Sequence, residues 1–145
     1  MRIAVVDPQA YTPPYDDELC RALAAAGADV QLLTAHFTHG QAPEPRGYER
    51  RELFGPPLAG LIERRPSSRV RVPLKATGHA LGLVRLVRHA RSWGADVVHW
   101  QWAPLPSLDA RAMRAAGRDA GATVFTAHDV LPRRSRDAAQ LWAEL

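Results

Sequence analysis

Residues 122–132 read Ala-Thr-Val-Phe-Thr-Ala-His-Asp-Val-Leu-Pro, an apolar run that ends in two ionisable side chains. From Thr123 to Thr126 the residues are mostly β-branched or aromatic and show no alternation of polar with apolar positions. This pattern predicts a parallel strand that is buried on both faces. Ligands of open α/β sheets bind beyond the carboxyl ends of such strands. His128 is therefore the first candidate for chemistry, although a histidine here could equally cap a turn or bond to a neighbouring loop.

The rest of the chain alternates between strand patterns and helix patterns. Short apolar runs predict strands at 2–7, 29–34 and 95–102, with a short extended piece at 48–54. Apolar spacing and terminal signals predict helices at about 16–27, 78–93, 104–118 and 135–145. This order predicts an α/β fold, a Rossmann-like doubly wound parallel sheet in a single domain.

The predicted helix at 78–93 has an apolar face. Leu81, Val84, Val87 and Ala90 recur every three residues, so we expect them to face the core. The chain before this helix contains Pro66 and Pro73, which are expected to interrupt regular structure because proline lacks a backbone N–H.

Positive charge is concentrated in residues 62–93, which hold Arg85, Arg88 and Arg91 at helical spacing. A solvated helix face is the ordinary interpretation. The alternative is a basic strip that holds the protein at an anionic membrane surface. Other basic residues close by in the sequence are Arg69, Arg71 and Lys75. Nucleic acid is a less suitable partner, because few aromatic residues are interleaved with these charges.

Several classes of protein are disfavoured by missing motifs. Neither the glycine-rich dinucleotide fingerprint nor a P-loop is present, and a receiver domain would need clustered acids and a late lysine. The single cysteine, Cys20, excludes an internal disulfide and is expected to be a small core residue. With no signal peptide and no run long enough to span a bilayer, we expect a cytoplasmic protein.

Polar and aromatic side chains follow the predicted strands at their carboxyl ends, where we expect them to meet at one edge of the sheet and contact substrate. They are Asp7, Tyr11, Gln101, Trp102, His128 and Asp129. By residue type, His99 could join Asp7, His128 and Asp129 around a metal ion. No metal is expected, however, because no local ligand spacing such as His-Glu-x-x-His occurs. His99 lies inside a predicted strand and fits the core equally well, and tryptophans such as Trp102 are more often core residues.

Four segments, in order along the chain, resemble the N-terminal half of a family 4 glycosyltransferase with the GT-B fold. They are Met1-Arg-Ile-Ala-Val-Val-Asp7, residues 19–34 with the spacing Leu-x-x-x-Leu-x-x-x-Gly-x-x-Val-x-Leu-x-Thr, Ala95-Asp-Val-Val-His99, and Thr123-Val-Phe-Thr-Ala-His-Asp129. The resemblance spans nearly the whole chain. It implies an enzyme with two Rossmann-like domains around a cleft, the first binding the acceptor and the second binding a nucleotide-sugar.

The same resemblance implies transfer with retention at the anomeric carbon, usually without a metal or other cofactor, to a sugar or lipid-linked acceptor. The family's histidine corresponds to His128, which would hydrogen-bond the transferred sugar or the acceptor and is our catalytic candidate. The family's glycine-rich first loop is replaced by Thr12-Pro-Pro-Tyr15, so backbone contacts to phosphate are not carried over to this loop.

The donor-binding domain of such an enzyme does not occur within residues 1–145. We therefore expect these residues to be the acceptor-side domain, cut before the donor domain that would be its partner, and not to transfer sugar alone. A different class, a non-catalytic α/β binding or interaction module, remains the alternative.

Overall fold

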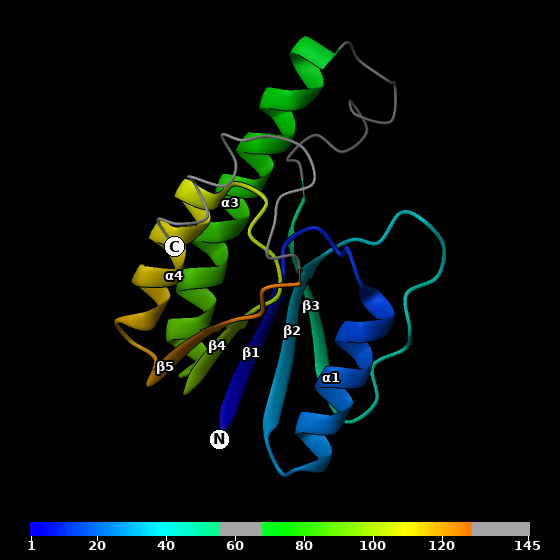
Figure 1. The fold of residues 1–145 in the computed structure, drawn as a ribbon, viewed down its shortest axis with the longest axis vertical. Coiled ribbons are helices and arrows are strands. Elements are labelled where there is room, and N and C mark those ends of the chain that lie inside the picture. The colour runs from blue at the N-terminus through cyan, green and yellow to red at the C-terminus, as the bar shows by residue number, and fades with distance from the viewer. Residues whose placement is uncertain (56–67, 129–145) are drawn as a thin grey trace.

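The computed structural model describes residues 1–55 and 68–128, in which five parallel strands form one sheet in the order β3-β2-β1-β4-β5 (Figure 1). The elements are β1 (Arg2–Asp7), α1 (Pro13–Ala25), β2 (Asp29–Ala35), β3 (Glu49–Phe54), α3 (Ser68–Trp93), β4 (Val97–Trp100), α4 (Pro106–Gly117) and β5 (Ala122–Phe125). The chain adds strands first on one side of β1 and then on the other. The point where the order reverses lies between β1 and β4, which is where open α/β sheets bind ligands.

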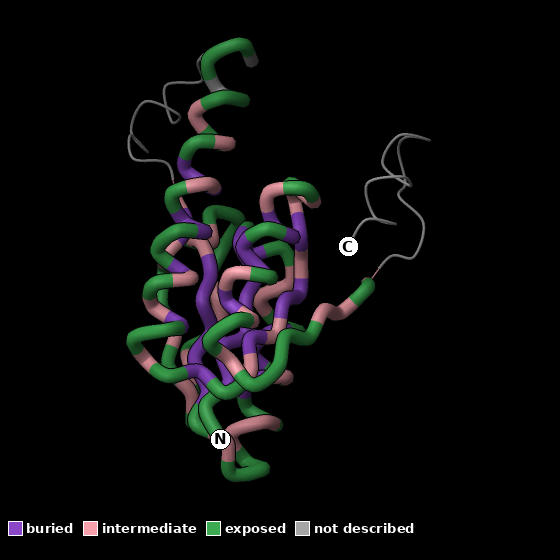
Figure 2. Tube along the Cα trace, turned by 90° about the vertical axis from the view of Figure 1, so that its left-hand side faces the viewer, coloured by how far each residue is buried: buried purple, intermediate pink, exposed green. Residues whose placement is uncertain are grey.

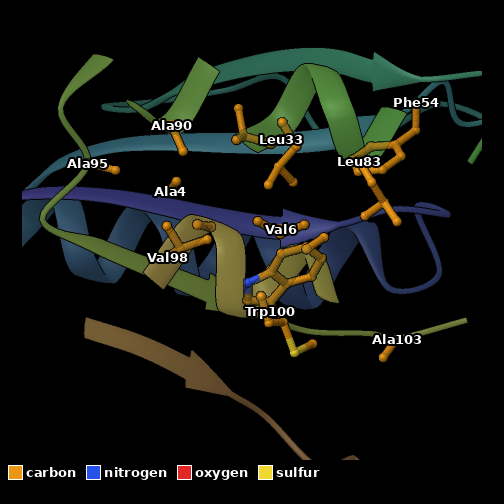
Figure 3. Packing of buried hydrophobic residues seen from close by; sticks show 14 residues of the cluster. Ala4, Val6, Leu33, Phe54, Leu83, Ala90, Ala95, Val98, Trp100 and Ala103 are labelled. Carbon is orange, nitrogen blue, oxygen red and sulfur yellow. The ribbon is translucent and has the colours of Figure 1, made fainter. Parts of the chain in front are cut away.

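Helices cover both faces of the sheet because the side chains of β1 alternate between two apolar clusters. Ile3 and Val5 pack with Cys20 of α1, which is buried as predicted. Ala4 and Val6 face the opposite cluster, which contains side chains of α3 and α4 (Figure 3). Burial on both faces explains why the strand reads as a continuous apolar run. The prediction of a doubly wound α/β sheet is confirmed.

α3 is longer than predicted and contains Pro73, so the expectation that this proline interrupts the chain was wrong. Proline removes one helical hydrogen bond, a cost that is high in a dry interior. Here the proline is exposed, on the part of α3 that extends beyond the sheet (Figures 1 and 2). Water can therefore reach the carbonyl left without its usual partner.

The face of α3 that packs on the sheet also differs from the prediction. Leu83, Leu86 and Ala90 are buried, whereas Leu81 and Val84 are exposed. The reason is a close approach at Gly82, where the ring of Phe54 occupies the space that a Cβ atom would need. With Gly82 against Phe54, a second apolar stripe, offset from the predicted one, meets the core. Val87 is half-buried, and Ala90 is the member of the predicted stripe that is buried.

β5 is not covered on both faces as predicted. Ala122, Thr123 and Val124 are exposed and Phe125 is half-buried, and β5 pairs only with β4 among the described strands. An apolar run shows that a segment favours a strand, but it does not show how many neighbours that strand has. The predicted helix at 135–145 lies outside the described residues.

Candidate functional site at the carboxyl edge of the sheet

Asp7 ends β1 and organises the loop that follows it. The side chain is fully buried, and its Oδ1 accepts a hydrogen bond from the Gln9 N–H at 3.1 Å. Its Oδ2 accepts from the N–H groups of Tyr11 at 2.6 Å and Thr12 at 3.3 Å. The same loop holds Ala10 at a φ of 52°, a left-handed conformation that is uncommon for a residue other than glycine. Asp7 thus fixes the loop rather than presenting a free carboxylate.

An aromatic cluster stands beside this loop, with His128 and Trp102 at its centre. Their rings stack with centroids 4.5 Å apart and an angle of 13° between the planes. The Trp102 indole Nε1 donates to Oγ1 of Thr12 at 3.2 Å, which joins the cluster to the loop held by Asp7. Tyr11 meets the edge of Trp102, and Tyr15 meets the edge of His128, each at a centroid distance of 5.2 Å. Both tyrosines are exposed.

Gln101 gives the cluster a buried polar group. Its Oε1 lies 3.1 Å from Nε2 of His128. Because a carboxamide oxygen only accepts hydrogen bonds, Nε2 carries the hydrogen and Nδ1 is the acceptor of the neutral ring. The Gln101 Nε2 is buried and has no partner among the described residues. Gln101 is fully buried, so only the half-buried imidazole of His128 can present a polar atom at the surface.

His99 has a structural partner. Its Nε2 lies 2.7 Å from Oγ1 of Thr126, and its pKa is lowered by burial and then by electrostatic repulsion from His128. Within residues 1–55 and 68–128, no three His, Cys, Asp or Glu side chains are grouped so that they could hold a metal ion.

The structure brings Asp7, Tyr11, Gln101, Trp102 and His128 to one edge of the sheet, whereas Asp129 lies outside the described residues. Sequence reasoning missed Thr12 and Tyr15. Tyr15 was assigned to the connection before the helix, but α1 begins at Pro13, because proline is well tolerated at the first positions of a helix. The available signal was an aromatic residue directly after Thr12-Pro-Pro, shortly beyond the carboxyl end of the first strand.

The three arginines of the predicted basic strip do not share the same contacts. Arg85 donates to the carbonyl of Leu53 at 3.4 Å, and Arg91 makes two bonds to Asp119 at 2.9 and 2.7 Å. Among the described residues Arg88 has no hydrogen-bond or ion-pair partner. The three arginines are exposed but do not form one free surface.

These observations define a parallel α/β domain with a cluster of aromatic and polar side chains at the point where the strand order reverses. The sequence matches the family model described as Glycosyltransferase Family 4 over residues 17–145. The chain therefore belongs to glycosyltransferase family 4 and is a glycosyltransferase module. A comparison with curated proteins found no match. In the part of the chain that the structure describes, no helix combines the length and the apolar character that crossing a membrane requires.

Proposed function

We propose that this chain is the acceptor-binding half of a GT-B glycosyltransferase that transfers a sugar from a nucleotide-sugar with retention. A second domain would bind the donor, and the reaction would need no metal or other cofactor. The observation that carries the proposal is the stack of His128 on Trp102, with Gln101 hydrogen-bonded to the same imidazole. The resemblance to GT-B enzymes supports the donor class and the retention.

The site suits a sugar because it combines exposed aromatic faces with a hydrogen-bond acceptor. Tyr11 and Tyr15 expose rings against which the apolar face of a pyranose can pack. Nδ1 of His128 can accept a hydrogen bond from a hydroxyl group, and the buried Gln101 holds the imidazole in place through Nε2 of the ring. These preorganised contacts would orient the sugar as charge develops at the anomeric carbon.

The test is steady-state transfer by the complete enzyme. His128→Ala should lower turnover by about a hundredfold or more, the range seen when one preorganised hydrogen-bonding group is removed from an active site. His39→Ala is the matched control, because His39 is an exposed histidine on the loop between β2 and β3. Circular dichroism should show the same fold in both variants. A His128→Ala enzyme within a few-fold of wild type would reject the catalytic assignment, and a complete protein without transfer would favour the non-catalytic binding module.

We also infer that the acceptor is lipid-linked and that the protein works at the inner surface of the cytoplasmic membrane. The supporting observation is the end of α3 that extends beyond the sheet (Figure 1). Val70 and Val72 are exposed there, beside the exposed basic residues Arg69 and Lys75. Apolar side chains next to basic ones are typical of segments that lie in the interface of an anionic bilayer.

A further inference from the structure

Two aspartates meet in the interior behind the candidate site. Asp7 and Asp16 are both almost fully buried, and their carboxyl groups lie close enough for a hydrogen bond between them to help raise the pKa of Asp16. Two carboxylates cannot share a hydrogen bond unless one of them carries a proton. Both oxygens of Asp7 already accept backbone N–H groups. The proton therefore belongs to Asp16, which donates to Asp7.

The surroundings of Asp16 favour this protonated form. Asp16 lies in the first turn of α1, where the helix dipole favours a negative charge by about 0.3–1 kcal/mol. Burying a carboxylate costs several kcal/mol, so burial outweighs the dipole. Burial, followed by the hydrogen bond to Asp7 and the Asp7 charge, raises the pKa of Asp16 to about 9. The second oxygen, Oδ1, has no partner among the described residues, and Asp16 lines a cavity of about 20 Å³ that has room for one water molecule.

We propose that the hydrogen bond from Asp16 to Asp7 holds the loop between β1 and α1 in place, so that Asp16 is a positioning residue for the aromatic cluster. The contacts run from Asp16 to Asp7, from Asp7 to the backbone of Tyr11 and Thr12, and from Thr12 to Trp102. Loss of the proton would leave two negative charges in contact away from water. Repulsion would then release the loop and separate Thr12 from Trp102.

A test must distinguish the titration of Asp16 from that of the other ionisable groups around the pair. On α1, Asp17 accepts a hydrogen bond from the Tyr48 hydroxyl, and burial raises the pKa of Cys20. Burial raises the pKa of Tyr48 as well, which lies beside Arg50. Partial burial and the Asp7 charge raise the pKa of Tyr11. The remaining charged residue that lines the cavity is Glu52. The pKa values of the thiol and of both phenols named here are raised, and a transition near pH 9 that is absent in Asp16→Asn therefore reports on Asp16.

The test uses ¹⁹F NMR of the protein labelled with 5-fluorotryptophan, recorded between pH 6 and pH 10. The Trp102 signal is assigned by its absence in Trp102→Phe. In wild type this signal should shift with a midpoint of about 9, while the signals of Trp93 and the buried Trp100 stay constant. In Asp16→Asn the shift should disappear, because the carboxamide donates to Asp7 at every pH. Asp17→Asn, a change in the neighbouring acid, should keep the shift.

A Trp102 signal that does not change up to pH 10, or that shifts equally in Asp16→Asn, would overturn the inference. The importance of the loop for catalysis rests on the proposed function, but this experiment needs no sugar. If the shift is present and the complete enzyme does not transfer sugar, only the proposed function fails. If transfer is found, Asp16→Asn should remove a rise in the acceptor KM above about pH 9, whereas Asp16→Ala should raise that KM at all pH values.

Discussion

His79 of α3 donates from Nε2 to Oδ1 of Asp109 of α4 over 2.6 Å, and neither side chain exposes more than 2% of its surface. The other oxygen of Asp109 accepts a hydrogen bond from the Leu105 N–H at 2.7 Å, just before α4 begins. The two helices on this face of the sheet are thus joined by a polar contact inside an apolar layer. Phe54 stacks on the imidazole at a centroid distance of 5.7 Å.

Removing Asp109 should therefore destabilise the fold. Asp109→Ala leaves His79 buried without a partner and the Leu105 N–H without an acceptor, so we expect the free energy of unfolding to fall by about 1–3 kcal/mol for each of these two groups. Urea denaturation would measure this change. Asp119→Ala is the control, because it breaks an exposed ion pair with Arg91 and should cost at most about 1 kcal/mol. Equal losses in the two variants would contradict the importance of burial.

Gly82→Ala should disturb the contact that fixes the rotation of α3. The added methyl group would overlap the Phe54 ring, so the ring must move, at a cost of about 1–3 kcal/mol for overpacking. Gly55→Ala is a matched control, since a Cβ atom added there would meet nothing within 4 Å and its φ is not in the left-handed region. Thermal unfolding of both variants would reveal the difference. A neutral Gly82→Ala would mean that Phe54 does not set the packing of α3.

Asp16→Asn should change the pH dependence of stability. The pKa of Asp16 rises from its ordinary value of 3.8 to about 9 on folding, so the folded protein binds a proton that the unfolded chain has released between these values. The stability of wild type from this source is therefore complete below about pH 4 and falls as the pH rises towards about 9. Asparagine does not titrate, so the melting temperature of Asp16→Asn relative to wild type should increase from pH 5 to pH 9. A constant difference would show that Asp16 is not protonated in the fold.

The aromatic rings at the site make a separate prediction for the complete enzyme. Tyr15→Ala should raise the acceptor KM roughly two- to tenfold, the loss expected for one aromatic contact, whereas Tyr15→Phe keeps the ring and should resemble wild type. Initial rates at varied acceptor concentration would measure this. A strong loss in Tyr15→Phe would instead assign the role to the hydroxyl group.

Membrane binding can be tested by sedimentation with lipid vesicles. The protein should partition to vesicles rich in anionic lipid more than to neutral ones. The double variant Arg69→Ala, Lys75→Ala should weaken this binding roughly thirtyfold, because each basic residue near the surface contributes about 1 kcal/mol. Arg111→Ala, Arg114→Ala is the control, since it removes the same charge from exposed positions on α4. Equal partitioning of wild type to both kinds of vesicle would exclude the basic end of α3 as a membrane contact.

Local patterns in the sequence were sufficient to predict the order of strands and helices and the strand ends where polar side chains meet. Asp7, Gln101 and His128 could be placed together because the carboxyl ends of parallel strands share one edge. Their roles in sugar transfer stay predictions. The contacts that could not be predicted join residues far apart in the chain. Phe54 of β3 packs against Gly82 of α3, on the side of the helix that is buried. The pKa of Asp16 depends on Asp7 at the end of β1, which the apolar spacing of α1 does not reveal.

The loop held by Asp7 has a consequence for the entropy of binding. Fixing the backbone of one residue costs about 1–2 kcal/mol, and a flexible loop would lose that freedom when a ligand arrives. Here three backbone N–H groups are hydrogen-bonded to Asp7, and Ala10 has a left-handed conformation. The backbone between β1 and α1 therefore loses its conformational freedom during folding, before a ligand binds. A sugar meeting Tyr11 and Trp102 would thus have only side chains left to order, so even a weakly interacting neutral ligand could be held in one orientation.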